Sequence, residues 1–195
     1  MMNPSELIAE ITAAFQDEPY PSDANIVYDN TGFHLECIEV RDAFQGHRWQ
    51  EVPDDVLSTE RTGLSFMSKE GFKYYLPAFM CSLLKDSSVV DEGISMVLLL
   101  LKLPTEIDSA VLAEQIQRFE VAGKLPDVDL NEVLQNQLVH TNTEINAFIA
   151  SASQFTRAQG RAIYHFLAYT RDECGDEFLS TEADLAIQRY WFQFA

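Results

Sequence analysis

The sequence is short of glycine, of closely spaced cysteines and of long apolar runs, and each shortage excludes a class of protein. It has only 8 glycines, and no phosphate-binding or dinucleotide-binding glycine pattern occurs among them. Cys37, Cys81 and Cys174 are an odd number without close pairing, which indicates a reducing compartment rather than a disulfide framework. The longest apolar run, residues 96–101, is far too short to cross a bilayer.

The first residues also lack the positive charge that opens a secretory signal peptide, and they carry Glu6 and Glu10 instead. Without a signal peptide or a membrane span, the chain is expected to be soluble. Together with the unpaired cysteines, this predicts a cytoplasmic protein.

Basic side chains are scarce as well. The chain has 13 Lys and Arg against 31 Asp and Glu, a formal net charge of -18. Residues 1–60 hold 13 of the acids and only 2 of the bases. Such a surface repels phosphate backbones and anionic headgroups, so the sequence predicts no direct binding to nucleic acid or membrane. It attracts a basic protein partner, although acidity can also serve solubility alone.

Apolar residues recur at three- and four-residue steps along most of the chain, which is typical of amphipathic helices. Two capping boxes, Asn3 with Glu6 and Thr156 with Gln159, mark helix starts. Further helices are expected after Ser68, Thr105 and Asp129, the last with a break near residues 140–143, and a final helix is expected after Ser180 or Thr181.

Two segments remain open between strand and helix. Residues 26–38 can form a short hairpin around residues 30–32, but a helix from Leu35 to Phe44 fits nearly as well. Residues 95–103 fit a buried strand or two helical turns. We therefore expect one mainly α domain over residues 1–195, a compact multi-helix fold with at most one short β-hairpin or a single buried strand.

The segment Leu64–Leu84 has the densest aromatic content and organises the expected core. Ser68 is a good N-cap, and apolar residues follow it at helical spacing to about Lys85. Pro77 removes a backbone donor and crowds the carbonyl of Lys73, so the sequence predicts a bend over residues 74–77 that divides this helix.

This segment also carries a resemblance. A tryptophan-bearing acidic loop followed by L-x-F…F-x-Y-Y-L-P-A-F resembles a family of uncharacterised bacterial proteins, and a later F-T-x-x-Q-x-x-A-I-x-x-F-L-x-Y run is similar too. The resemblance implies a shared fold and no catalytic residues. The residues concerned are Trp49, Leu64, Phe66, Phe72, Tyr74, Tyr75, Leu76, Pro77, Ala78, Phe79, Phe155, Thr156, Gln159, Ala162, Ile163, Phe166, Leu167 and Tyr169.

Signals for chemistry are weak. A metal site would need ligands such as Cys37, His34 and His47 to converge, but no C-x-x-C, H-x-x-x-H or H-E-x-x-H spacing occurs. Cys81 lies in an apolar helix, where it serves as a small hydrophobic residue rather than a nucleophile. The sequence therefore predicts no catalytic residue, no metal and no cofactor.

Two interpretations compete for the aromatic residues around Pro77. In the first, Tyr74 and Tyr75 brace the bend with their hydroxyls on freed backbone groups, and the Trp49 indole anchors the acidic loop on the core. In the second, one tyrosine joins Trp49 as an exposed anchor within the acidic field. The second interpretation gives a partner-binding set of Trp49, Glu51, Asp54, Asp55, Tyr74 and Tyr75.

From the acidity and the missing catalytic motifs we expect a non-enzymatic interaction protein, most specifically an immunity or inhibitor protein that occludes the cleft of a basic toxin or nuclease. The alternative is an enzyme or small-ligand binder with a pocket near Tyr74–Pro77. A subunit of a cellular assembly, marked by a large apolar patch, is a third possibility. The sequence does not specify an oligomeric state.

Overall fold

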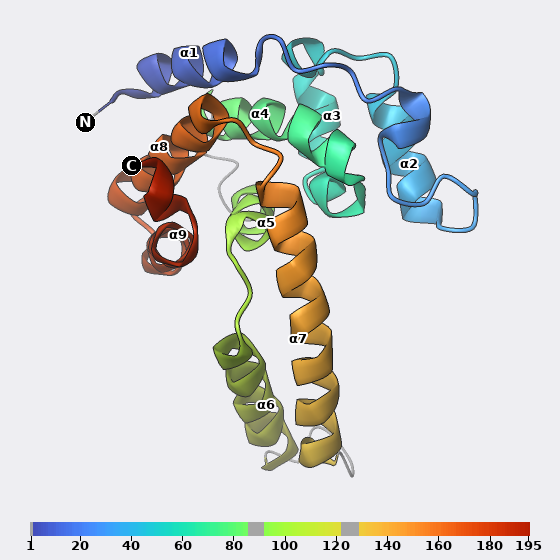
Figure 1. The fold of residues 1–195 in the computed structure, drawn as a ribbon, viewed down its shortest axis with the longest axis vertical. Coiled ribbons are helices and arrows are strands. Elements are labelled where there is room, and N and C mark those ends of the chain that lie inside the picture. The colour runs from blue at the N-terminus through green and yellow to red at the C-terminus, as the bar shows by residue number, and fades with distance from the viewer. Residues whose placement is uncertain (1, 86–91, 122–128) are drawn as a thin grey trace. The chain divides into compact units, whose positions relative to one another are not determined.

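The computed structural model describes residues 2–85, 92–121 and 129–195 (Figure 1). These residues form nine α-helices and four short 3-10 helices, and no β-strand occurs among them. The mainly α fold class predicted from sequence is confirmed. The α-helices are α1 (Pro4–Phe15), α2 (Leu35–Phe44), α3 (Asp54–Thr59), α4 (Lys69–Lys85), α5 (Glu92–Leu101), α6 (Glu106–Val121), α7 (Leu130–Ala152), α8 (Arg157–Glu173) and α9 (Glu177–Arg189); the 3-10 helices are η1 (Asp23–Asn25), η2 (Trp49–Glu51), η3 (Gly63–Phe66) and η4 (Trp191–Phe194).

Contacts divide the chain into two compact units. The first unit comprises Met1–Lys102 with Gln154–Ala195, and the second comprises Leu103–Ser153. The single domain expected over the whole chain stays a prediction.

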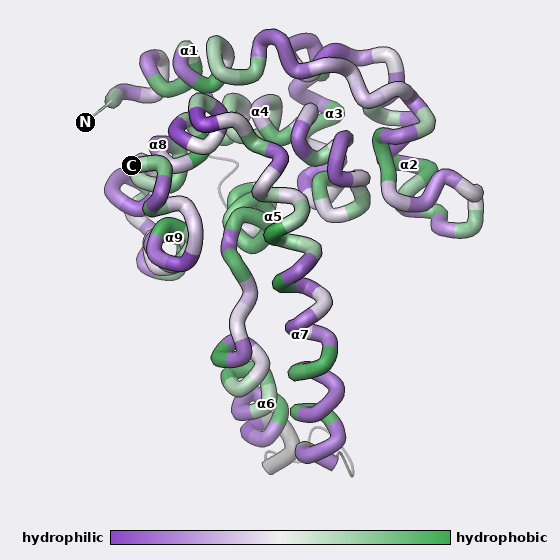
Figure 2. Tube along the Cα trace, viewed as in Figure 1, coloured by the Kyte–Doolittle hydropathy of each residue, from purple (hydrophilic) through white to green (hydrophobic). Residues whose placement is uncertain are grey.

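The core of the first unit forms where α1, α4, α8 and α9 pack together. Leu7, Ile11 and Phe15 make one stripe of α1, and all three are fully buried. Trp191 of η4 is also fully buried, and its indole N–H donates to the carbonyl of Leu101 at the end of α5. Figure 2 shows α5 as an almost continuous apolar segment, as a helix in this core requires.

Both predicted capping boxes are present. In α1 the Glu6 N–H donates to the Asn3 side chain, and in α8 the Gln159 N–H donates to the Thr156 hydroxyl. The predicted cap of the last helix is wrong. Asp176 caps α9 by accepting from the Leu179 N–H at 2.9 Å, whereas the Ser180 hydroxyl donates to a carbonyl of α8.

Helices form in both open segments, α2 from Leu35 in the first and α5 up to Leu101 in the second. In α2 the side chains of Cys37, Val40 and Phe44 are buried at three- and four-residue steps, so burial on one face selects the helix over the hairpin. The predicted hairpin is absent from residues 26–38, where the one strand-like pairing is an isolated bridge between Val27 and Met67. Residues 92–101 form α5, because its buried side chains also follow helical spacing.

Helix α4 is continuous from Lys69 to Lys85, so the predicted division at Pro77 is wrong. A proline inside a helix costs about 3 kcal/mol. Here every residue from Tyr74 to Cys81 is buried, and the packing of this stretch offsets that cost. Ser68 precedes the helix as predicted, and its hydroxyl accepts from the Gly71 N–H at 3.0 Å.

The second unit is a pair of helices, α6 and α7. The predicted break near residues 140–143 is wrong, since α7 runs unbroken through them. The apolar pattern lapses there because Thr141 makes a buried polar contact, with its hydroxyl 2.6 Å from that of Ser109 on α6. The predicted end of α6 near Gly123 lies outside the described residues. In the part of the chain that the structure describes, no helix is both long and apolar enough to span a membrane.

Candidate functional site

Trp49 is a buried anchor and not an exposed one. Its side chain is 4% exposed, and its indole N–H donates to the carbonyl of Phe15 at 3.2 Å. The indole thus ties η2 to the end of α1, as expected of a tryptophan that holds an acidic loop on the core.

Tyr74 and Tyr75 are buried as well, with 4% and 0% exposure. The Tyr75 hydroxyl donates to the carbonyls of Phe44 at 2.9 Å and His47 at 3.0 Å. It therefore fixes the loop after α2 and does not bond a backbone group freed by Pro77. The interpretation of these aromatics as solvent-facing anchors is wrong, because all three side chains are buried and the polar ends of Trp49 and Tyr75 donate to carbonyls of other segments.

The acidic members of the predicted set do face solvent. Glu51, Asp54 and Asp55 are exposed, at η2 and the first turn of α3. Asp54 and Asp55 also line a cavity of about 320 Å³ together with Arg61 and Lys85, so two cations partly balance their charge. Their part in partner binding stays a prediction.

Exposed apolar side chains gather elsewhere, at the start of α2. Phe33 is 92% exposed, Leu35 68% and Tyr28 55%. Glu36, Glu39 and Asp42 follow at three-residue steps along the same helix and are also exposed. We call these six residues, Tyr28, Phe33, Leu35, Glu36, Glu39 and Asp42, the α2 surface.

The loop that carries Phe33 is held by hydrogen bonds. The Asp29 carboxylate accepts from the Thr31 N–H and hydroxyl, and the Tyr28 hydroxyl lies 3.1 Å from Nε2 of His34. Arg41 on α2 donates to the side chain of Asn30 at 2.8 Å. The exposed phenylalanine is therefore presented on an ordered loop, which reduces the entropy lost when a partner binds.

Glu39 adds to the negative field of this region. It lies close enough to Glu60, after α3, to raise the pKa of the Glu60 carboxyl, although burial of Glu60 contributes more to that rise. Two carboxylates that lie this close together favour a positive group between them. Arg41 and Asp42 form an ion pair at 2.7 Å, so Arg41 neutralises only part of the surface.

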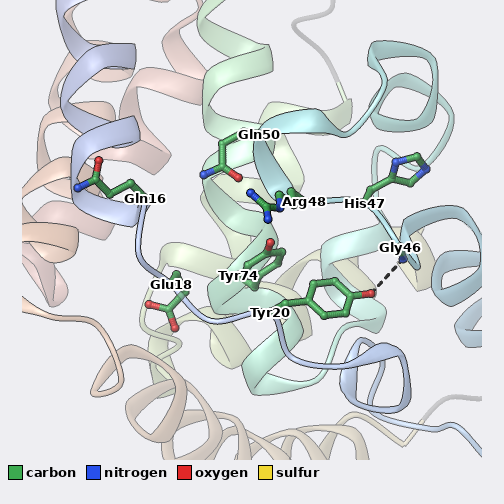
Figure 3. Close-up of a pocket in the computed structure, with 8 residues that line it drawn as sticks. All are labelled: Gln16, Glu18, Tyr20, Gly46, His47, Arg48, Gln50 and Tyr74. Atoms are coloured by element: carbon green, nitrogen blue, oxygen red, sulfur yellow. Dashed lines mark hydrogen bonds between the residues drawn. The ribbon is translucent and has the colours of Figure 1, made fainter.

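A polar pocket lies beside Tyr74, and Figure 3 shows its lining. Its volume is about 320 Å³. Four stretches of the first unit contribute to it: the end of α1, the loop after it, the loop and η2 that follow α2, and α4. The lining residues are Gln16, Glu18, Tyr20, Gly46, His47, Arg48, Gln50 and Tyr74.

Two tyrosines of this pocket have raised pKa values. Burial raises the pKa of Tyr20, helped by its hydrogen bond to Asp23, and burial also raises the pKa of Tyr74. Both phenols are therefore neutral at physiological pH. Glu18 is fully engaged, with one oxygen 2.8 Å from the Lys73 ammonium and the other accepting from the Gln159 amide at 2.7 Å.

The residues considered for metal or thiol chemistry are not arranged for it. No group of three or more His, Cys, Asp or Glu suited to a metal occurs in residues 2–85, 92–121 and 129–195. His34 and Cys37 contact Tyr28 and Phe66 instead. Burial raises the pKa of Cys81 to about 11, so the thiol carries almost no thiolate at neutral pH.

Residues 3–122 match the model of a family of unknown function, DUF6714. The chain belongs to this family. The matched range contains Trp49 and the aromatic segment up to Phe79, and it ends before the similar run at residues 155–169. No curated protein and no solved structure matches the chain.

Sequence reasoning missed Phe33 as a site residue, and its alternative hypothesis of a pocket near Tyr74–Pro77 did not include the other residues that line the polar pocket. A signal for Phe33 was present, since it follows Gly32, whose φ of +87° turns the chain, and precedes a helix whose apolar stripe starts only at Cys37. Those other residues had no local signal, because the lining comes from positions up to 58 apart in sequence, Gln16 to Tyr74.

Proposed function

We propose that this protein is a non-enzymatic interaction protein of the cytoplasm, and more narrowly an immunity or inhibitor protein for a basic toxin or nuclease. The observation that carries the proposal is the α2 surface, where Phe33, almost fully exposed, stands on an ordered loop beside three exposed carboxylates. Aromatic residues ringed by charges are the usual anchors of tight protein contacts.

The mechanism would be occlusion. A toxin that acts on a polyanion needs a cleft lined by Lys and Arg, and the carboxylates of Glu36, Glu39 and Asp42 are spaced to enter such a cleft. Phe33 and Leu35 would fill an apolar recess at its edge and exclude water from the ion pairs. The net charge of -18 would speed the encounter at low ionic strength.

The first test is genetic. An immunity protein is expected beside its toxin, so an adjacent gene for a basic protein should be toxic when expressed alone and harmless with this chain. Reversing charge with Glu36→Lys and Glu39→Lys should abolish protection, whereas the matched change Glu173→Lys and Glu177→Lys, at exposed positions away from the α2 surface, should preserve it. Equal protection by both variants would contradict the proposal.

Where no such neighbour exists, affinity capture from the native host gives the second test. Wild-type protein should retain a basic partner that the Glu36→Lys, Glu39→Lys variant loses and that elutes with rising salt. Recovery of no basic partner, or recovery unaffected by the α2 variant, would exclude this function.

A second candidate function, a small-ligand binder, is favoured by the pocket at Tyr74. A polar cavity with titratable residues of raised pKa is a common property of ligand sites. A thermal-shift screen of small polar metabolites should yield compounds that raise the unfolding midpoint of the wild type and not of Gln50→Ala. A screen in which every hit acts equally on both proteins would exclude this pocket as a ligand site.

A further inference from the structure

We propose that the pocket beside Tyr74 binds a small molecule with a single carboxylate, and that the Arg48 guanidinium is its counter-charge. This inference rests on the second candidate function, and names the ligand class for that pocket. Three observations carry it: free donors that converge, a charge balance that fits one negative charge, and a lining fixed before any ligand arrives.

Hydrogen-bond donors without acceptors meet in this pocket. Figure 3 shows the Arg48 guanidinium and the Tyr74 hydroxyl pointing toward each other, with the Gln50 amide beside the guanidinium. Among the described residues, none forms an ion pair with Arg48 and none accepts a hydrogen bond from the Gln50 amide or the Tyr74 hydroxyl. A planar guanidinium with two further donors matches the two oxygens of a carboxylate.

The charges around the pocket select a monoanion. Glu18 is the one carboxylate that lines it, and the ammonium of Lys73 already neutralises that group. Arg48 is then the one guanidinium or ammonium in the described lining, and it offers a single positive charge. The charge of Arg48 acts on the Tyr74 phenol more strongly than that of Glu51 nearby, and the described lining has no second guanidinium or ammonium to balance a dianion such as phosphate.

The pocket is ordered by contacts that no ligand has to supply. The Trp49 indole points inward to Phe15, which leaves its neighbours Arg48 and Gln50 to face the cavity. The Tyr20 hydroxyl accepts from the Gly46 N–H at 3.1 Å, and Tyr75 holds the carbonyl of His47. Donors held in place lose little entropy on binding.

The cavity also limits ligand size. A volume of about 320 Å³ lies at the lower end of the range for small-molecule pockets. The edge-to-face pair of Tyr20 and Tyr74, with ring centroids 5.4 Å apart, gives one wall an aromatic face. A carboxylate attached to a single ring or a short apolar chain therefore fits.

The test uses benzoate and its neutral isostere benzamide, titrated into the full ¹⁵N-labelled chain at constant ionic strength. Benzoate should shift the amide signals of Gly46, Arg48 and Gln50 saturably, and benzamide should not. The variant Arg48→Gln should weaken benzoate binding about tenfold or more, as expected for loss of a charged hydrogen bond. The control Arg161→Gln, an exposed arginine on α8 outside the pocket, should bind like the wild type.

Each contrary result is informative. Equal binding of benzoate and benzamide, or unchanged benzoate binding by Arg48→Gln, would overturn the carboxylate assignment and leave a pocket for neutral ligands. Tighter binding of inorganic phosphate than of benzoate would overturn the proposal that the ligand carries a single negative charge. No binding of benzoate or butyrate would overturn the inference itself, while the metabolite screen with Gln50→Ala would still decide the second candidate function.

Discussion

Aromatic side chains gather in two regions of the first unit, and the regions differ in what surrounds them. In the first, Trp49 and Tyr75 are buried and donate to carbonyls of distant segments. In the second, Phe33 and Tyr28 are exposed on a loop whose hydrogen bonds are mostly local. Trp49 and Tyr75 thus have both apolar neighbours and an acceptor for their polar ends. The rings of Phe33 and Tyr28 face solvent instead.

The largest effect is expected from Trp49→Ala. Loss of the indole leaves a cavity between η2 and α1 and removes the hydrogen bond to Phe15, which should lower the free energy of unfolding by about 3–5 kcal/mol. Urea denaturation measures it. Phe192→Ala, which removes an aromatic side chain 60% exposed, is the control and should change stability little. A similar, small loss from both would mean that Trp49 is not a core residue.

Gly71→Ala tests the same region through its backbone. A Cβ at this position would lie 2.0 Å from the carbonyl oxygen of Ile26, and a backbone atom held by the Ser68 N–H cannot easily move away. We expect a loss of about 3 kcal/mol, at the upper end of the usual overpacking range. Lys69→Ala, exposed in the same turn of α4, is the matched control. Wild-type stability of Gly71→Ala would show that α4 does not approach Ile26 so closely.

Features of the fold that depend on neighbouring residues were predictable from sequence. The capping boxes at Asn3 and Thr156 use atoms three residues apart, so the sequence contains every group involved. The same holds for the apolar stripe of α1. The effect of Pro77 was misjudged because the free-energy cost of a proline inside a helix is visible in the local sequence. The stabilisation that offsets it comes from the packing of α4 against other segments, which the local sequence does not show.

The candidate sites could not be predicted in this way. The carbonyls that accept hydrogen bonds from Trp49 and Tyr75 lie 34 and 31 residues away in sequence. No sequence pattern shows that the fold brings them within hydrogen-bond distance. For Phe33 the turn at Gly32 and the apolar stripe that starts at Cys37 are local signals, but no sequence pattern shows whether other segments cover the ring. The sequence did predict the acidity of the first 60 residues, but not that it borders an exposed aromatic residue on α2.

The buried tyrosines should also make stability depend on alkaline pH. Burial raises the pKa of Tyr75 above its usual value of about 10, so above that pH the unfolded chain releases a proton that the folded chain keeps. The stabilisation is complete below pH 10 and is lost as pH rises toward the folded pKa. Tyr75→Phe should reduce the slope of unfolding free energy against pH by up to about 1.4 kcal/mol per pH unit.

Urea titrations from pH 9 to 11 measure this slope. Tyr28→Phe is the control, because Tyr28 is 55% exposed and its hydroxyl can ionise in the folded chain with less penalty. An equal slope for the wild type and Tyr75→Phe would show that the Tyr75 phenol ionises as readily in the folded state as in the unfolded state.

The smallest effect on stability is expected from Phe33→Ala, and this makes the variant the sharpest test of the exposed region. The ring is 92% exposed, so its removal should change the free energy of unfolding by less than about 0.5 kcal/mol. If Phe33 contacts a partner, its removal should nevertheless weaken binding of that partner by at least about 2 kcal/mol, the usual threshold for a hot spot. Leu99→Ala, on an exposed residue of α5, controls for loss of surface hydrophobicity. If Phe33→Ala leaves partner binding unchanged, the α2 surface is not the contact; if it destabilises the fold, the ring is packed in solution and the contrast between the two aromatic regions fails.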